Sequence, residues 1–281
     1  MRNDTEHIYH RKVNQVIDYI SARLEQPLPL ARLARHIGVS ERQLLRIMRS
    51  ALSESLAAYI ARQRVERSVL YLQSEKMSLA HLAEKVGYDN PQSFSKAFKK
   101  HFGISPKTYL HELQQKLQNF VQNGENTQAL ESEICEIEER ELVYIRIVGR
   151  YGESELYNAA WGKLVGFLIE NQAFSAETRF IGISFDSPNV TRSEQCRFYA
   201  CACVQKAITP KGEFGTIRLQ RGRYAVFTHK GSYAGLQALY NNISLNFAHT
   251  LRFGLAFEEY VNSRHDTKEE DLLTKIFIPI Q

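Results

Sequence analysis

The sequence predicts two domains, an all-α domain followed by an α+β domain built from two similar halves. Three observations lead to this prediction. The chain has 281 residues, a length typical of about two domains. A helical segment of its first part recurs 49–50 positions later, and a strand–turn–helix unit of its second part recurs 82 positions later. Residues 1–120 contain 19 Lys and Arg against 11 Asp and Glu, whereas the remainder contains 17 against 20.

The composition, 43% hydrophobic and 24% charged, is that of an ordinary globular protein. No apolar run approaches the roughly 20 residues that cross a bilayer, and the polar N-terminus has no apolar signal region. We therefore expect a cytoplasmic protein that does not interact with a membrane. The basic first part and acidic second part indicate that only the first part meets a polyanion.

The first repeat begins with LARLARHIG at residues 30–38, which recurs as LAHLAEKVG at residues 79–87. The segments after each glycine also match, with Arg46 in the place of Lys96. Each copy predicts a helix, a tight turn that contains glycine, and a second helix. This is the order of a helix-turn-helix.

The second helix of the later copy has clear end signals. Asn90 can cap it, Pro91 suits its first position and Gly103 can end it. At about 100° per residue, one face collects the residues that we expect to be buried: Phe94, Ala97, Phe98, His101 and Phe102.

The opposite faces of the two second helices are basic and polar. In the first copy this face carries Arg42, Gln43, Arg46 and Arg49, while Leu44, Ile47, Met48 and Ala51 are expected to pack inward. In the second copy it carries Gln92, Ser93, Lys96 and Lys99, with Lys100 beside them. A single basic face is usually a solvated surface, but one duplicated in register favours double-stranded DNA as the partner, because the major groove admits a helix and offers acceptors to Arg and Lys.

Residues 54–73, between the copies, have the apolar spacing of a long helix. A stiff connector would fix the two basic helices relative to each other. One chain could then contact two neighbouring major-groove segments, about 34 Å apart.

The segments LARLARHIGVSERQLLRIMRS and GYDNPQSFSKAFKKHFGISPKTYL resemble the DNA-binding domain of AraC/XylS-type bacterial transcription regulators. The resemblance covers about residues 8–113 and implies a fold of seven helices. Ser53 departs from it, because the family often has glycine there. The N-terminal position of the domain resembles the Rob-type branch of the family. The resemblance implies base or backbone contacts by Arg42, Gln43, Arg46, Gln92, Ser93 and Lys96.

The second part changes to strand signals. Residues 143–148 and 223–229 each predict a strand followed by a glycine turn and a helix, and Tyr157 and Tyr240 take related places in the two helices. Further strands are expected at 180–185, 198–205, 215–219 and 272–280. The predicted organisation is a DNA-binding domain at 1–113, a helix end and linker at 114–140, and an α+β domain at 141–281. A groove where related halves meet is a favoured ligand site.

This second part resembles the GyrI-like effector-binding family. The resemblance lies in the Gly-x-Tyr turns, Trp161, the segment FEEY at 257–260 and the ending DLLTKIFIPI at 271–280. It implies a cleft for small apolar or cationic molecules, in which aromatic faces and one carboxylate contact the ligand. The implied ligand-binding residues are Tyr151, Trp161, Tyr233, Glu258 and Tyr260.

Two further features bear on the ligand and on possible catalysis. Lys275 stands where the family frequently has Glu, and a lysine there would favour anionic or neutral ligands. Some members of the family are hydrolases that use a carboxylate and a tyrosine, a role that Glu258 and Tyr260 could take.

Other chemistry has little support. Cys201 and Cys203 are expected to share one face of a strand, and a structural role is expected for them and for Cys196, because cysteine is often buried and no paired Cys-x-x-Cys accompanies them. The sequence has no Gly-x-Ser-x-Gly motif or phosphate-binding loop. We therefore expect no metal, no cofactor and no catalytic residue.

The leading hypothesis is a DNA-binding transcription regulator that responds to a small-molecule effector and is not an enzyme. The effector would act through contacts between domains or through recruitment of RNA polymerase. One alternative is a hydrolase of hydrophobic small molecules that is tethered to DNA. Another is an architectural DNA binder whose second domain binds proteins.

Overall fold

The computed structural model describes residues 2–52, 54–74, 77–112, 115, 131–188, 190–247, 249–252, 254–264 and 266–281. The chain forms two compact units, residues 1–125 and 126–281. Ser53 and most of the predicted linker lie outside the described residues. None of the helices in the described ranges is long and apolar enough to cross a membrane.

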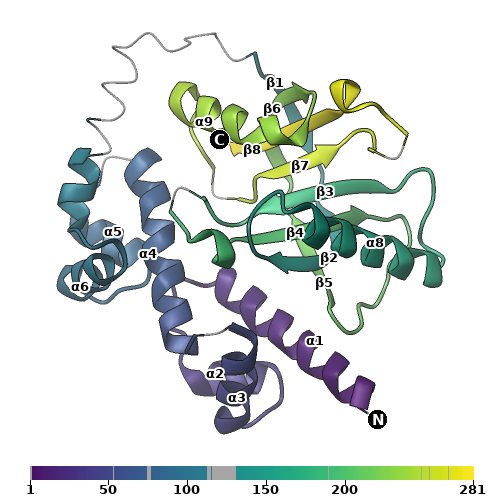
Figure 1. Cartoon of the computed structure of the whole chain (residues 1–281). Helices are drawn as coiled ribbons and strands as arrows, with labels where there is room; N and C mark the ends of the chain where they lie inside the picture. The colour runs from purple at the N-terminus through teal and green to yellow at the C-terminus, as the bar shows by residue number, and fades with distance from the viewer. Residues whose placement is uncertain are drawn as a thin grey trace. The chain divides into compact units, whose positions relative to one another are not determined.

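The secondary structure in the described residues of the first unit is all helical, as the sequence predicts (Figure 1). Its helices are α1 (Arg2–Ser21), α2 (Leu30–His36), α3 (Glu41–Leu52), α4 (Leu56–Ser74), α5 (Leu79–Lys85) and α6 (Pro91–Phe102). Residues 106–112 are also helical, which gives seven helices in the described part of this unit. The pairs α2–α3 and α5–α6 are the two copies of the repeat, and α4 joins them.

The helix ends follow the local chemistry. The Asn90 side chain accepts a hydrogen bond from the Ser93 amide at 2.8 Å, and Pro91 is the first residue of α6. Gly103 ends α6 in the left-handed conformation, with φ of 79°. All three residues have the roles that the sequence predicts for them.

The core of the first unit consists of the apolar faces of its helices. Leu44, Ile47 and Met48 are buried in α3, and Phe94 and Phe98 are buried in α6. The prediction that Ala51 packs inward is wrong, because Ala51 is exposed. It lies in the last turn of α3, where Leu52 packs against the core instead.

The second unit is one antiparallel sheet of eight strands in the order β1-β6-β8-β7-β3-β4-β2-β5. Its long helices are α8 (Ser154–Glu170) and α9 (Leu236–Asn246). Three short 3₁₀ helices are η1 (Ser193–Gln195), η2 (Tyr233–Gly235) and η3 (Glu269–Asp271). The strands are β1 (Glu133–Ile137), β2 (Arg140–Val148), β3 (Arg179–Ser184), β4 (Arg197–Cys203), β5 (Phe214–Leu219), β6 (Gly222–Lys230), β7 (Phe257–Tyr260) and β8 (Leu273–Ile280).

The two predicted halves are present. The series β2, α8, β3, η1, β4 recurs as β6, α9, β7, η3, β8, and the halves meet where β3 pairs with β7. The amide of Gly149 donates to the Cys196 carbonyl at 2.9 Å, and the amide of Gly231 donates to the Leu272 carbonyl at 2.8 Å. The glycine turns aligned in the sequence therefore close each half in the same way.

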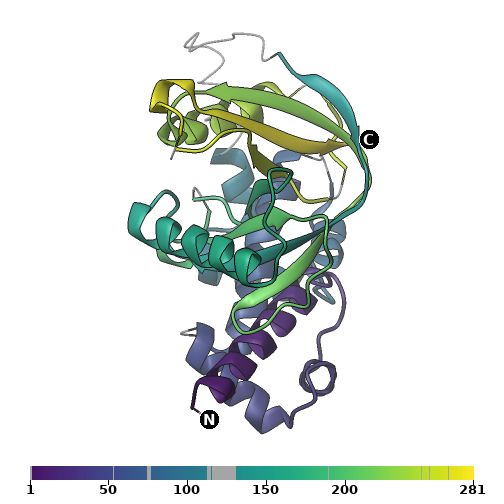
Figure 2. The ribbon, with the colours of Figure 1, turned by 90° about the vertical axis from the view of Figure 1, so that its right-hand side faces the viewer.

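Strands β1 and β7 are additions to the prediction. β1 lies within residues 114–140, so that part of the expected linker belongs to the sheet. Only Glu138 and Glu139 separate β1 from β2, yet β1 lies at one edge of the sheet and β2 next to the other edge. The two ends of the sheet must therefore lie close together, and the sheet curls, as Figure 2 shows.

The curl gives the sheet an inner and an outer face. Tyr144, Tyr199 and Tyr224 are among the buried residues of the inner face. On the outer face, α8 packs over β2 and β4, and α9 packs over β6 and β8. Side chains that alternate along each strand are thus buried on both sides.

Candidate DNA-contacting helices and ligand site

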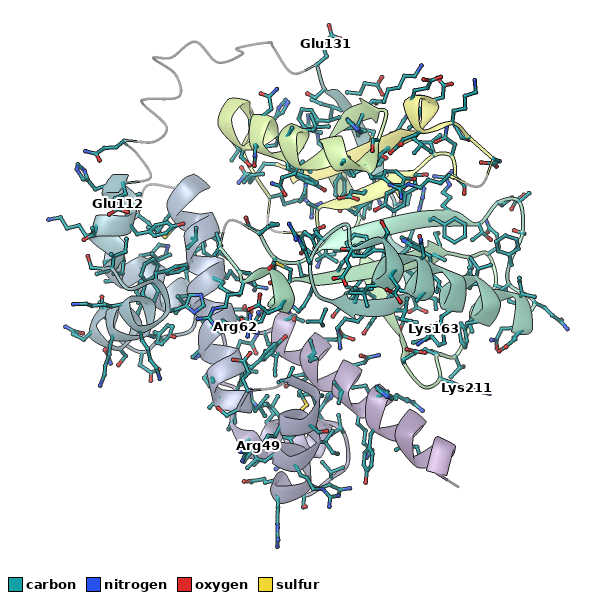
Figure 3. The ribbon with its side chains drawn as sticks, in the orientation of Figure 1. Arg49, Arg62, Glu112, Glu131, Lys163 and Lys211 are labelled. Carbon is teal, nitrogen blue, oxygen red and sulfur yellow. The ribbon has the colours of Figure 1, made fainter. Side chains whose placement is uncertain are left out.

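The outward face of α3 carries the three predicted arginines. Arg42, Arg46 and Arg49 are exposed, and Gln43 is half-buried. The Ser40 hydroxyl caps the helix by accepting from the Gln43 amide at 3.2 Å. Figure 3 labels Arg49 on this helix.

The outward face of α6 carries the corresponding polar set. All five of its predicted contact residues are exposed: Gln92, Ser93, Lys96, Lys99 and Lys100. Among the described residues, none of the cations of these two faces forms an ion pair. Six positive charges are therefore held on two helices without internal neutralisation, which is the electrostatic pattern of a surface that binds a polyanion.

The connector α4 is anchored to the segment after α1 and to the second copy of the repeat. The Arg64 guanidinium donates to the carbonyls of Leu24 at 2.9 Å and Gln26 at 2.7 Å, in the chain segment that follows α1. The same guanidinium lies 5.7 Å from the ring centre of Tyr88, which follows the glycine of the second repeat. Gly87 packs so closely that an added Cβ would lie 2.4 Å from the Leu24 carbonyl oxygen.

A buried carboxylate on α4 provides a second anchor. Glu66 is 5% exposed, and its carboxylate lies 3.1 Å from Arg62 on the same helix and 3.3 Å from His101 on α6. Arg62, labelled in Figure 3, also pairs with Glu54 at 2.7 Å. These contacts join the middle of α4 to α6 and to Glu54, in the turn that follows α3, which supports the predicted fixed relation between α3 and α6.

In the second unit, Glu258 lies on the outer face of the sheet at the junction of the halves. It is 5% exposed. Tyr240 of α9 donates to one carboxylate oxygen at 3.0 Å, and Tyr260 of β7 donates to the other at 2.6 Å. Burial raises the pKa of Glu258 above its ordinary value of 4.5, while the two tyrosine hydrogen bonds oppose this shift.

Aromatic rings from both halves surround this carboxylate. The ring of Trp161 in α8 packs edge-on against the ring of Tyr260, with 5.7 Å between the ring centres. The ring centres of Tyr233 and Tyr260 are 5.3 Å apart. An added Cβ on Gly182 would lie 2.5 Å from the Tyr260 hydroxyl, so the glycine leaves room for this ring over β3. The structure thus brings together four of the five predicted ligand-binding residues: Trp161, Tyr233, Glu258 and Tyr260.

Tyr151 differs from its counterpart Tyr233. Its hydroxyl lies 2.9 Å from the Asp186 carbonyl and 2.8 Å from the Arg197 carbonyl, which share its one proton, and it accepts from the Asp186 amide at 3.1 Å. Burial next to Asp186 raises the pKa of Tyr151. The Tyr151 hydroxyl is therefore occupied by the backbone, which leaves only the ring for contact with a ligand.

Three residues of this cluster were not among the predicted contacts. Tyr240 holds Glu258 directly, and burial together with the Glu258 charge raises the pKa of Tyr157. The Arg264 guanidinium lies 4.4 Å from the centre of the Tyr233 ring, at the exposed side of the cluster. The equivalent positions of Tyr157 and Tyr240 in the repeat were a signal for both tyrosines, whereas the loop position of Arg264 gave none.

Lys275 does not belong to this cluster. In the register of β7 and β8, Lys275 is opposite Glu259, whereas Glu258 is opposite Ile276. Neighbouring residues of a strand point to opposite faces, so Lys275 lies on the inner face of the sheet. The structure therefore separates Lys275 from Glu258, and at this cluster the lysine gives no basis for the expected preference for anionic or neutral ligands.

Two of the cysteines lie in the core of the sheet. Cys201 is buried and Cys203 is half-buried, and both pack in the core of the inner face, as the strand alternation predicts. In the part of the chain that the structure describes, no group of His, Cys, Asp and Glu side chains is arranged to hold a metal ion.

The two units correspond to two known domain families. Residues 130–281 match the model of the GyrI-like small molecule binding domain, which covers more than half of the chain. Residues 33–112 match the model of a helix-turn-helix domain. The family matches therefore agree with the predicted order of the two domains.

Individual relatives match either nearly the whole chain or about a third of it. The chain is 24% identical to the transcriptional regulator Rob of Salmonella typhimurium over 96% of this chain and 98% of that protein. It is 34% identical to the Msm operon regulatory protein of Streptococcus mutans over 36% of this chain and 37% of that protein. The chain spans less than half of the length of the first curated relatives that it matches. An AraC-type regulator structure from Chromobacterium violaceum covers 36% of this chain and 91% of its own, with 26% identity and a TM-score of 0.35.

Proposed function

Because the chain belongs to the GyrI-like small-molecule-binding family and carries an AraC-type helix-turn-helix domain before it, we propose that it is a sequence-specific, ligand-responsive transcription regulator. In this proposal α3 and α6 enter two neighbouring major-groove segments of one DNA duplex. A small molecule binds at the cluster around Glu258 and changes transcription through contacts between domains or through RNA polymerase. The protein then acts in the cytoplasm, where its DNA partner is.

The observation that carries this proposal is the pair of exposed basic faces on α3 and α6. The cores beneath them, Leu44 with Met48 and Phe94 with Phe98, occupy matching positions. The connector α4 has 19 residues and is about 28 Å long at 1.5 Å per residue. This length is comparable with the ~34 Å between successive major-groove segments on one side of B-DNA.

Selection of bound sequences from a random DNA pool, with the full chain, tests the proposal. We expect one shared motif, and Arg46→Ala should relax one part of it and weaken binding by about 1–3 kcal/mol, because arginine makes bidentate hydrogen bonds to guanine. Arg221→Ala removes an exposed arginine of the second unit and should leave binding unchanged. Equal affinity of the wild-type chain for unrelated sequences would contradict the proposal and favour an architectural DNA binder.

A second candidate, a hydrolase of hydrophobic small molecules, is favoured by the 2.6 Å contact between Tyr260 and Glu258. A buried carboxylate next to a tyrosine hydroxyl can move a proton to or from a bound substrate. Turnover of hydrophobic esters by the wild-type chain, lost in Glu258→Gln, would support this candidate. A regulator shows no turnover in either form.

A further inference from the structure

An exposed leucine lies on the basic face of α3. Leu45 is 45% exposed, and it is absent from the residues that form or cover the core of this half of the first unit. It is the only exposed large hydrophobic side chain of α3, and α6 has none; both helices are described in full. The matching position of α6 is Ser95, which is half-buried.

The neighbours of Leu45 place it among the arginines. Arg42 and Arg49 lie three residues before and four residues after it, and residues at these spacings are adjacent on a helix surface. Arg46 follows it directly. A single exposed leucine is unremarkable on most surfaces. This one shares the face that, under the function proposed above, meets the edges of base pairs.

We propose that Leu45 packs against the C5-methyl group of a thymine, and that this thymine neighbours a guanine contacted by an α3 arginine. The inference rests on the proposed function and adds the class of sequence that α3 binds. In the major groove, thymine alone presents a methyl group, whereas cytosine presents an amino group at the adjacent position. A leucine gives no hydrogen-bond partner to the amino group of cytosine or to the carbonyl of thymine, so contact with Leu45 favours thymine through burial of the methyl group.

The direct test removes only the methyl group. In a DNA site selected by the wild-type chain, each thymine is replaced in turn by deoxyuridine, and the dissociation constant is measured. The position at which Arg46→Ala relaxes base preference marks the half of the site that α3 contacts. We expect one thymine in this half at which deoxyuridine weakens wild-type binding by about fourfold, the effect of about 0.8 kcal/mol for one buried methyl-sized group.

Two variants connect that thymine to Leu45. Leu45→Ala and Leu45→Gln should bind the thymine and deoxyuridine sites equally well, while keeping the helical circular dichroism of the wild type. Leu251→Ala removes a leucine of nearly equal exposure, 44%, from the second unit and should keep the fourfold difference. Persistence of the difference in both Leu45 variants would overturn the proposal.

The possible outcomes distinguish a failure of the Leu45 proposal from a failure of the proposed regulator function. If no deoxyuridine substitution in the α3 half affects the wild type, but Arg46→Ala still relaxes base preference, the role of Leu45 is refuted and the regulator function stands. If the wild-type chain shows no sequence preference at all, both proposals fail.

Discussion

At the scale of single residues, two consecutive glutamates of β7 have different neighbours, and only one of them lies in the candidate ligand site. Glu258 and Glu259 are consecutive, but only Glu258 lies among the tyrosines of the outer face. Lys275, which the sequence suggested as a neighbour of the ligand, lies on the inner face with Glu259. The charge nearest to the aromatic cluster at its buried end is therefore negative, and this favours a cationic ligand.

This arrangement predicts different effects of two charge-removing variants. A lipophilic quaternary ammonium ion should change the fluorescence of Trp161, the only tryptophan of the chain, because this residue packs against Tyr260. Glu258→Gln should weaken binding by at least about tenfold, because removing one partner of a buried charge pair costs about 2–5 kcal/mol. Lys275→Gln should leave the dissociation constant unchanged. Equal losses in both variants, or tighter binding of anionic amphiphiles, would contradict this assignment.

At the scale of helices and strands, the two glycines of the repeat have the same conformation but different surroundings. Gly38 has φ of 62° and Gly87 has φ of 85°, both in the left-handed region. An added Cβ at Gly38 meets nothing within 4 Å. At Gly87 it would lie 2.4 Å from the Leu24 carbonyl and 2.9 Å from the Arg64 guanidinium, the contacts that connect α4 to the second repeat.

Replacing each glycine by alanine should distinguish the energetic cost of the left-handed backbone, present in both variants, from the cost of a steric clash, present only at Gly87. Gly38→Ala should cost about 1–2 kcal/mol of the free energy of unfolding, the usual cost of a left-handed residue with a side chain. Gly87→Ala should cost clearly more, because backbone must also move. Urea unfolding of the full chain, followed by the helical circular dichroism signal, measures both values. Equal costs for the two variants would show that the turn at Gly87 adjusts without strain.

The sequence predicted elements well where a repeat or an end signal was present. Asn90, Pro91 and Gly103 predict the limits of α6, the repeats predict both helix-turn-helix pairs and two strands, and strand signals predict four more. β1 and β7 were missed because EICEI and FEEY are short and carry two glutamates each. Their glutamates look solvated in the sequence, but Glu258 is buried on the outer face by the side chains packed there, Tyr240 and Tyr260 among them, which no local pattern indicates.

The site was predicted less completely than the fold. Strand alternation and helical spacing assign a residue to a face, and this sufficed for Arg46 and Lys96. They do not specify which partners meet across elements. The bond from Tyr240 to Glu258 and the stacking of Arg264 on Tyr233 depend on how α9 and the loop after β7 pack over the sheet.

At the scale of the molecule, one chain carries both basic helices, and the connector that joins them is bonded through its middle to the segments beside it. Arg64 bonds to the segment after α1, and His101 of α6 contacts Glu66 of α4. Two helices held in this way have one fixed distance between them and one fixed rotation relative to each other about the DNA axis. A DNA site must then match both, unlike a site for two flexibly linked domains, which tolerate a range of spacings.

Insertions between the two halves of a selected DNA site test this rigidity. Five base pairs turn one half by about half a helical turn, and ten restore the phase but separate the halves by a further ~34 Å. Because α4 cannot lengthen, both insertions should weaken binding at least about tenfold, to the affinity of one half-site. Five base pairs inserted outside the site should have no effect. Binding is measured by fluorescence anisotropy, with the number of chains per duplex determined at saturation, where we expect one. If the ten-base-pair insertion restores affinity, the two helices are not held at a fixed distance by α4, or they belong to two chains.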